Sequence, residues 1–184
     1  MTRQDDLSTL SLAILGLIRQ QPLTGYDIRK VFATTPMGHF SSSPGAIYPA
    51  LRRIERAGWV RGRAGQGKTG RRRIVYATTA RGRNVLERHL AQSVTHDDVV
   101  WRMDDLMLRF AFMDQVVGRE ATVRFLRDLA TEIDAHVADL HHYFDGAKDT
   151  LPACGRLAME NGIETYEMNA RWARRAIEEL QRES

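Results

Sequence analysis

The chain has 184 residues, of which 43% are hydrophobic, and a formal net charge of +4. This length suits one large domain or two small ones, and the hydrophobic content suffices for a core, which excludes a mostly disordered chain. The charge is divided unequally: residues 1–90 hold 16 Lys and Arg against 5 Asp and Glu, a net of +11, whereas residues 91–184 hold 11 against 18, a net of −7. A basic half that offsets a polyanion, followed by an acidic half that a polyanion would repel, predicts a nucleic-acid module joined to a module with another task.

The sequence gives no sign of a membrane or secreted protein. The longest apolar run near the N-terminus, residues 10–18, is too short to cross a bilayer, and Asp5 and Asp6 precede it where a signal peptide needs positive charge. A single cysteine, Cys154, allows no internal disulfide framework and fits a reducing compartment. We therefore expect a cytoplasmic protein without a membrane partner. No neighbour of Cys154 in the sequence would activate it as a nucleophile, so we expect neither an enzyme nor a cofactor.

Three amphipathic segments in the first half predict a cluster of helices. The second segment follows Thr24, a good N-cap residue, and the third begins at Pro44, whose fixed φ suits a first helical turn, and runs to Gly58. Pro49 lies about one turn inside the third helix, where we expect a local bend. The first segment carries apolar residues at the three-and-four spacing of a buried face: Leu7, Leu10, Ile14 and Leu17.

Two short strands, residues 59–63 and 72–78, flank a segment with three glycines, Gly65, Gly67 and Gly70. Lys and Arg residues load this hairpin with positive charge. Three helices followed by a basic β-hairpin are the parts of a winged helix-turn-helix, in which one helix enters the major groove and the wing holds the backbone. The sequence therefore predicts a winged helix-turn-helix DNA-binding domain over residues 1–92.

The third predicted helix presents an aromatic ring and guanidinium groups opposite its apolar face. For Arg53 and Arg56 the alternative is an ordinary solvated helix face, and this alternative stays open. We assign DNA contacts to polar residues of the helices and of the wing: Tyr26, Ser42, Ser43, Gly45, Tyr48, Arg52, Arg53, Lys68, Thr69, Arg71 and Arg72.

Four stretches, residues 15–18, 23–28, 43–60 and 72–82, together resemble the PadR family of bacterial transcriptional regulators over residues 7 to about 90. The resemblance includes Gly25-Tyr26, the Ile47-Tyr48-Pro49 of the third helix, and the wing exit that ends at Gly82. Trp59 departs from the family's usual Leu, and Gly70-Arg71-Arg72 from its common Gly-Arg-Pro. The resemblance implies a homodimeric repressor that binds a pseudo-palindromic operator and is released by a small-molecule effector.

The second half, residues 93–184, is predicted to be helical. A fourth helix capped by Thr79 runs toward His96, and apolar faces follow over residues 103–113 and 126–144. The last helix repeats apolar residues at alternating steps of three and four over residues 163–180, which indicates lengthwise packing on a partner. The predicted fold is thus mostly α with a small β-hairpin wing, completed by a C-terminal antiparallel coiled-coil-like dimerisation domain. The residues assigned to dimerisation are Leu7, Leu10, Ile163, Tyr166, Ala170, Ala173, Ile177 and Leu180.

Sulfur-containing and aromatic side chains gather in the second half. Such a surface suits a small apolar or aromatic effector, although we favour the plainer interpretation that the stripe is core. The candidate pocket residues are Trp101, Met107, Phe110 and Trp172.

Two alternative functions remain open. The first is a metal-responsive winged-helix sensor, although His136, His141 and His142 have no second ligand pair at a recognisable spacing, so we assign no metal ligands. The second is an RNA- or protein-binding adaptor without operator binding. An RNA reader stacks bases on exposed aromatic rings, and only Tyr26, Tyr48 and Trp59 qualify in the first half.

Overall fold

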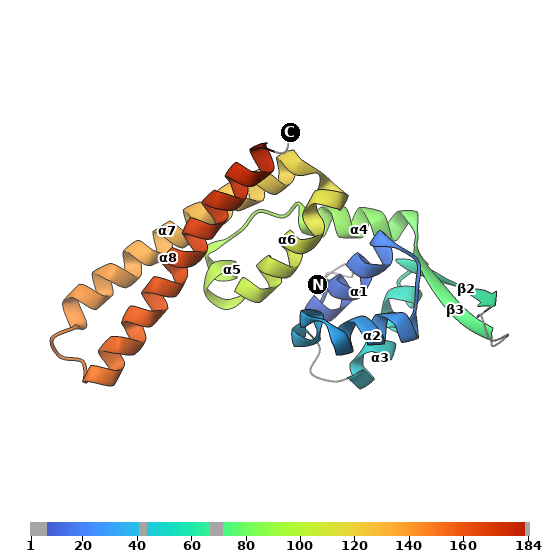
Figure 1. Ribbon diagram of the computed structural model, residues 1–184, viewed down its shortest axis with the longest axis horizontal. Coiled ribbons are helices and arrows are strands. Elements are labelled where there is room, and N and C mark those ends of the chain that lie inside the picture. Colours follow the sequence, from blue (N-terminus) through green and yellow to red (C-terminus); the bar gives the residue numbers. More distant parts are fainter. Residues whose placement is uncertain (1–6, 41–43, 67–71, 183–184) are drawn as a thin grey trace. The chain divides into compact units, whose positions relative to one another are not determined.

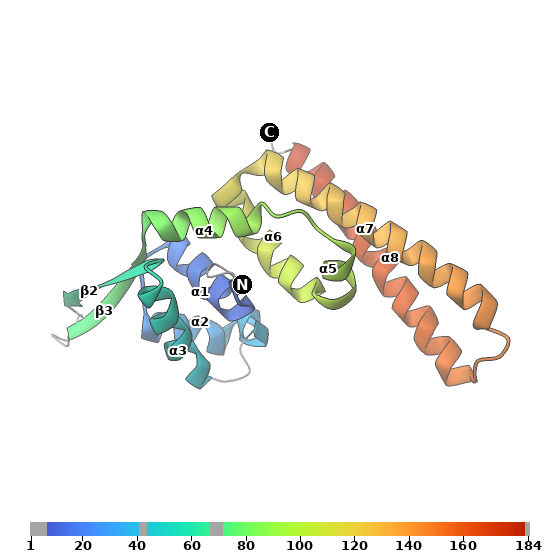
Figure 2. The same ribbon diagram turned by 180° about the vertical axis from the view of Figure 1, so that it is seen from behind.

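The computed structural model describes residues 7–40, 44–66 and 72–182, and the chain divides into two compact units, Met1–Leu90 and Ala91–Ser184. Figures 1 and 2 show the two units. The elements of the first unit are α1 (Thr9–Gln20), β1 (Leu23–Thr24), α2 (Gly25–Thr34), the 3-10 helix η1 (Pro36–Phe40), α3 (Pro44–Arg56), β2 (Val60–Gln66), β3 (Arg72–Thr78) and α4 (Ala80–Leu90). Those of the second are α5 (His96–Trp101), α6 (Met103–Val117), α7 (Arg119–Ala147) and α8 (Ala153–Arg182).

Helix α1 lies at the centre of the first unit. Its N-cap is Ser8, whose hydroxyl accepts from the Ser11 amide at 3.3 Å. The helix packs against α3, α4 and β3, so its buried surface is broader than the single stripe that the sequence predicts. Leu10 and Leu17 of that stripe are only half-buried. The fully buried residues are Leu12, Ala13, Ile14, Leu15 and Ile18.

Helices α2 and α3 form as the sequence predicts. Thr24 and Asp27 make a reciprocal capping box at the start of α2, in which the Asp27 amide donates to Thr24 Oγ1 at 3.1 Å. In return, the hydroxyl and the amide of Thr24 donate to Asp27 Oδ2 at 2.7 and 3.0 Å, and these two bonds lower the pKa of the Asp27 carboxyl group. Helix α3 continues past Pro49 to Arg56. Its inward residues Ile47, Leu51 and Ile54 are almost fully buried and anchor it to α1 and α2.

The sheet is antiparallel and three-stranded, in the order β1-β3-β2. The hairpin pairs Val60 with Thr78 at its base and Gln66 with Arg72 at the far end of the ladder. Strand β2 therefore extends three residues beyond Arg63, where the sequence analysis ended it. Trp59, the predicted first residue of this strand, lies before β2 and is buried. The sequence analysis missed β1, because two residues are too few to show alternation.

Helix α4 begins as predicted and ends earlier than predicted. Thr79 Oγ1 accepts from the Gly82 amide at 3.0 Å at the start of the helix. The helix stops at Leu90, and a separate helix, α5, follows a capping box between Thr95 and Asp98. The prediction of one helix toward His96 was therefore wrong, although the Thr-x-x-Asp signal that starts α5 is present in the sequence.

The second unit is built around the long antiparallel pair α7 and α8, which lie side by side in both views (Figures 1 and 2). Helices α5 and α6 both pack on α7. Cys154 is exposed in the first turn of α8. The core includes Leu106 and Phe112 of α6, Leu126 and Ile133 of α7, and Ala173 of α8.

This architecture confirms the predicted fold class. The chain is mostly helical, with a small antiparallel sheet that includes the hairpin β2–β3 and a helical C-terminal region. In Figures 1 and 2 the hairpin projects from the cluster of α1, α2 and α3. Within the described ranges, no helix combines the length and apolar composition that a bilayer crossing requires.

Candidate nucleic-acid interface

Helix α3 presents a basic and aromatic face on the side opposite its anchor. Tyr48 is 43% exposed, and Arg52, Arg53 and Arg56 are exposed as well. Because Ile47, Leu51 and Ile54 fix the inner side of the helix, these four side chains project from a rigid support. A helix of this kind fits the major groove of duplex DNA, which is about 12 Å wide.

The ring of Tyr48 rests directly against the start of α2. A Cβ atom placed on Gly25 would lie 2.8 Å from Cε1 of Tyr48, closer than real Cβ atoms approach other carbons. Glycine at position 25 therefore allows the Tyr48 ring to lie in contact with the start of α2. The next residue, Tyr26, is 61% exposed, and the guanidinium of Arg29 lies 5.7 Å from the centre of its ring.

The wing adds further exposed cations, namely Arg61 and Arg63 on β2 and Arg73 on β3. None of these three belonged to the predicted contact set, although they belong to the basic segment that the sequence analysis recognised. Ile74, the next residue on β3, is an exposed apolar residue. Such a combination of guanidinium groups suits phosphate backbone contacts, which give salt-dependent affinity.

Some of the predicted DNA-contact residues lie within the described residues, and others lie outside them. Tyr26, Tyr48, Arg52 and Arg53 are exposed on α2 and α3, and Gly45 is exposed in the first turn of α3. The backbone of Arg72 begins β3, but its side chain is outside the description. Five predicted contacts lie outside the described residues: Ser42, Ser43, Lys68, Thr69 and Arg71.

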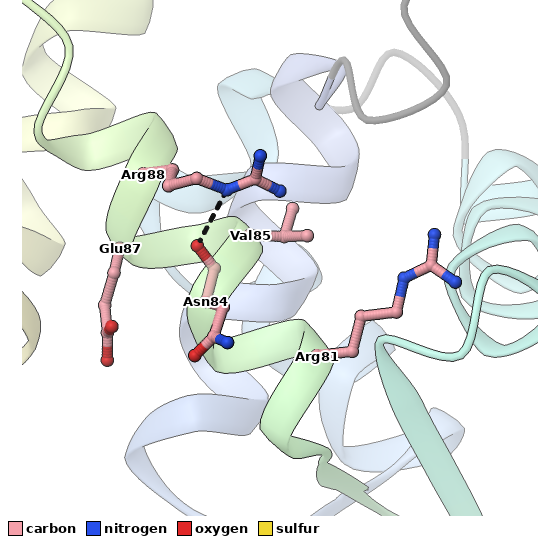
Figure 3. A pocket seen from close by; sticks show the side chains of 5 residues that line it. All are labelled: Arg81, Asn84, Val85, Glu87 and Arg88. Carbon is pink, nitrogen blue, oxygen red and sulfur yellow. Dashed lines mark hydrogen bonds between the residues drawn. The ribbon is translucent and has the colours of Figure 1, made fainter.

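Helix α4 carries a pocket to which the sequence analysis assigned no role. An open hollow of about 610 Å³ is lined by Arg81, Asn84, Val85, Glu87 and Arg88. Figure 3 shows Arg81 and Arg88 extending to the same side of α4, with Val85 between them. Arg88 Nε donates to the backbone oxygen of Asn84 at 3.4 Å, so part of the lining is tied to the helix itself (Figure 3).

The structure brings together two of the four candidate effector residues. Phe110 of α6 and Trp172 of α8 meet edge to face, with ring centres 5.2 Å apart, and Phe125 of α7 stacks on Phe110 at 6.5 Å. Met107 is half-buried on α6. Trp101 is 80% exposed at the end of α5. Sequence reasoning missed Phe125, because the spacing along one helix does not reveal which ring a neighbouring helix supplies.

The predicted dimerisation seam of the last helix packs within the chain. Ile163, Ala170 and Ala173 are buried in the unit formed by one chain, where α8 lies along α7. These three side chains are therefore covered by α7 within one chain, and their assignment to a dimer contact stays a prediction. Leu7 is likewise buried within the first unit. The remaining assigned residues are half-buried: Leu10, Tyr166, Ile177 and Leu180.

Two of the three histidines considered as metal ligands, His136 and His141, contact other side chains. His136 meets Tyr166 edge to face at 4.6 Å, and burial lowers the pKa of His136. His141 Nε2 lies 3.1 Å from Glu167 Oε1. Across the part of the chain that the structure describes, no group of three or more His, Cys, Asp or Glu is placed to hold a metal ion.

Comparison with known proteins covers both units. Residues 14–88 match the family model of the transcriptional regulator PadR-like family, and residues 103–181 match the model of the virulence activator alpha C-terminal region. The chain is similar to the negative transcriptional regulator PadR of Bacillus subtilis (strain 168), with 27% identity over 139 residues, which cover 76% of this chain and 75% of the relative.

Solved structures of similar proteins include two of Bacillus subtilis PadR. The complex with operator DNA is 22% identical, covers 94% of this chain and 99% of its own, and superposes with a TM-score of 0.42. The complex with p-coumaric acid is 21% identical, covers 95% of this chain and 99% of its own, and has a TM-score of 0.43.

Proposed function

We propose that the chain is a PadR-like transcriptional regulator and not an enzyme, because residues 14–88 match the model of that family. In this proposal it is a repressor that binds a pseudo-palindromic operator in double-stranded DNA as a homodimer. We further propose that a small-molecule effector releases it, and that it acts in the cytoplasm, where the operator lies. The observation that carries the proposal is α3, whose exposed Tyr48 and Arg52 stand opposite a buried anchor and near a basic wing. The word "negative" in the name of the relative from Bacillus subtilis supports repression.

The two units divide this work in the proposal. Residues 1–92 form the DNA-binding domain, and residues 93–184 form the dimerisation and effector-sensing domain. Net charges of +11 over residues 1–90 and −7 over residues 91–184 support this division, since phosphates attract the first half and repel the second. The boundary between the compact units falls at Leu90.

In the proposed complex, α3 enters the major groove. Tyr48 and Arg52 lie near base edges, while Tyr26, Arg53 and the amide of Gly45 meet phosphates. The wing follows the adjacent backbone through its basic residues. The proposed contacts of the wing and of the segment before α3 are Ser42, Ser43, Lys68, Thr69, Arg71 and Arg72.

In the proposed dimer, the contact includes the assigned residues that one chain leaves half-buried, namely Leu10, Tyr166, Ile177 and Leu180. Large apolar side chains that are exposed among the described residues of α5, α7 and α8 add to this proposed contact. These are Trp101, Tyr143, Leu157 and Met168. A homodimer would set two copies of α3 on half-sites one helical turn apart, about 34 Å along the duplex.

The proposed effector site is the aromatic cluster of Phe110, Phe125 and Trp172, which comes from three different helices. A flat apolar or aromatic molecule that separates these rings would alter the packing between α6, α7 and α8. Aromatic pairs contribute about 0.5–1.5 kcal/mol each beyond their buried area, so a ligand has to replace contacts of this size.

A binding measurement on the full chain tests the proposed function. The probes are a fluorescent duplex from the promoter region beside its own gene, a scrambled duplex of equal length, and each strand alone. We expect the native duplex to bind most tightly, with an affinity that falls as salt rises. Tighter binding to single strands would favour the RNA-adaptor alternative. Stoichiometric uptake of zinc or nickel in equilibrium dialysis would favour the metal-sensor alternative.

Tyr48→Ala and Arg52→Ala are each expected to weaken binding to the native duplex by roughly 10- to 100-fold, because a base-edge contact contributes about 1–3 kcal/mol. Both side chains are exposed on α3, so folding remains intact by circular dichroism. Arg175→Ala, which removes an exposed arginine of α8, is the matched control and leaves affinity unchanged. Equal affinities for all four proteins would contradict the role of α3.

Gly25→Ala is expected to weaken duplex binding about 10-fold by lifting the Tyr48 ring, since the new methyl group would lie 2.8 Å from Tyr48 Cε1. The free energy of unfolding changes little, because the helix preference of alanine over glycine, up to about 1 kcal/mol, offsets the cost of moving the Tyr48 ring. A double-mutant cycle measured by fluorescence anisotropy provides the check. In a Tyr48→Ala background, the same change at Gly25 has no further effect, and a full additional loss would show that Gly25 acts without Tyr48.

A further inference from the structure

One acidic residue lies within the basic surface formed by α3 and the wing. Glu55 belongs to the last turn of α3, is half-buried, and has the exposed Arg52, Arg53 and Arg56 as neighbours along the helix. A carboxylate at this position repels DNA phosphates, so it opposes the attraction that the arginines provide. Its presence calls for a physical reason other than DNA contact.

The carboxylate of Glu55 reaches from the helix to the wing. Its Oε1 accepts a hydrogen bond from the backbone amide of Gly62, in β2, at 3.1 Å. A hydrogen bond to an ionised acceptor is roughly twice as strong as one between neutral groups. The bond therefore ties the end of α3 to the third residue of the first wing strand.

The wing is shaped to receive this carboxylate. A Cβ atom on Gly62 would lie 2.8 Å from Glu55 Oε1, 2.7 Å from Cγ2 of Ile74 and 3.1 Å from Cε1 of Tyr76. Only glycine leaves room for all three neighbours. Tyr76 is the cross-strand partner of Gly62, and burial together with the nearby negative charge of Glu55 raises the pKa of its hydroxyl. The phenol thus stays neutral beside the carboxylate.

The covalent connection between α3 and β2 is a short turn that contains Gly58. Gly58 has a φ of 75°, a conformation that other residues rarely adopt, and no atom lies within 4 Å of where its Cβ would be. The turn makes backbone hydrogen bonds from the Gly58 amide to the Glu55 oxygen and from the Trp59 amide to the Ile54 oxygen, each 2.9 Å long. The hydrogen bond between the Glu55 side chain and the Gly62 amide adds a contact beyond this turn, because Gly62 lies in strand β2 of the wing.

We propose that Glu55 is a positioning residue that couples the wing to the DNA-reading helix and fixes the angle at which the wing meets the duplex. This inference rests on the proposed DNA-binding function. Glu55 touches no DNA in this proposal, and acts through Gly62 by holding the basic strands where their guanidinium groups reach phosphates while α3 occupies the groove.

The test compares Glu55→Ala, which removes the acceptor, with Glu55→Gln, which keeps an acceptor oxygen without the charge. We expect Glu55→Ala to weaken duplex binding about 10-fold, although simple electrostatics predicts tighter binding when a negative charge is lost. The slope of log affinity against log salt also falls, by about 0.9 for each phosphate contact that the wing loses. Glu55→Gln restores most of the affinity. Glu87→Ala, which removes a carboxylate from α4, is the control for charge and does not weaken binding.

A second readout needs no DNA. Amide hydrogen exchange of the free protein, followed by NMR, is expected to show the Gly62 amide exchanging at least 10-fold faster in Glu55→Ala than in wild type, with wild-type-like exchange in Glu55→Gln. Unchanged Gly62 exchange, or unchanged or tighter DNA binding by Glu55→Ala, overturns the coupling role. Failure of the wild-type protein to bind duplex overturns the proposed function instead, and the exchange data then decide alone whether Glu55 holds the wing.

Discussion

Gly82→Ala is expected to unfold the first unit under conditions in which the wild-type protein is folded. A Cβ atom on Gly82 would lie 1.9 Å from the backbone oxygen of Trp59 and 2.7 Å from its carbonyl carbon. No side-chain rotation relieves this overlap, because both colliding atoms belong to the backbone. The two chain segments must therefore move apart.

The surrounding hydrogen bonds make that movement costly. The Trp59 oxygen accepts from the Thr79 amide at 3.0 Å, and Thr79 Oγ1 donates to the Gly58 oxygen at 2.6 Å. Thr79 Oγ1 also accepts from the Gly82 amide, so the start of α4 and the turn before β2 share one network. Separating them breaks several bonds that contribute about 1 kcal/mol each and loosens the neighbouring core. We expect a loss of about 4 kcal/mol or more, a large share of the 5–15 kcal/mol typical of a domain.

Hydrogen exchange read by mass spectrometry measures this effect unit by unit. In Gly82→Ala, peptides from β2 and α4 lose protection, whereas peptides from α7 and α8 keep it. Gly162→Ala is the matched control, because it lies within α8 with no atom within 4 Å of the new methyl group and gains up to about 1 kcal/mol of helix stability. Wild-type protection in the α4 peptides of Gly82→Ala would refute the close approach.

Local signals in the sequence predicted the starts of α2 and α4 correctly. Thr24 caps α2 and Thr79 caps α4. These caps were predictable because each hydrogen bond joins residues only three positions apart, so that the residue types and their spacing can be taken from the sequence. The amphipathic pattern of α3 likewise identified its outward face, with Tyr48 and Arg52 exposed. These features depend on neighbours within about one helical turn.

Features that depend on distant partners were not predictable in the same way. The apolar repeat of α8 showed that Ile163 and Ala173 would be buried, but not whether the covering helix belongs to the same chain or a second copy. The 1.9 Å approach at Gly82 depends on Trp59, 23 positions earlier, and the hydrogen bond of Glu55 depends on the register of β2. The periodicity of the sequence predicts which face of a helix is buried, but only the tertiary structure shows which segment packs against that face.

Arg109→Ala is expected to destabilise the second unit by about 3 kcal/mol. The Arg109 side chain is 5% exposed on α6, and its Nη2 donates to the backbone oxygen of Gln92, in the segment between α4 and α5. Its guanidinium lies 5.0 Å from the ring centre of Phe125. Burial lowers the pKa of Arg109, yet a guanidinium stays charged at neutral pH. Truncation thus removes packing, a cation–π contact and a hydrogen bond together.

Arg109→Met separates these contributions, because methionine keeps most of the buried stem against Phe125 and removes the charge and the donor. Replacing a buried charge by an apolar side chain of similar volume is often neutral, so we expect Arg109→Met to lie within about 1 kcal/mol of wild type in urea unfolding. Both variants lose the bond to the Gln92 oxygen, and both therefore speed hydrogen exchange in residues 91–95. Equal stability losses in the two variants would show that the charge and its hydrogen bond, and not the packed stem, hold this part of the second unit together.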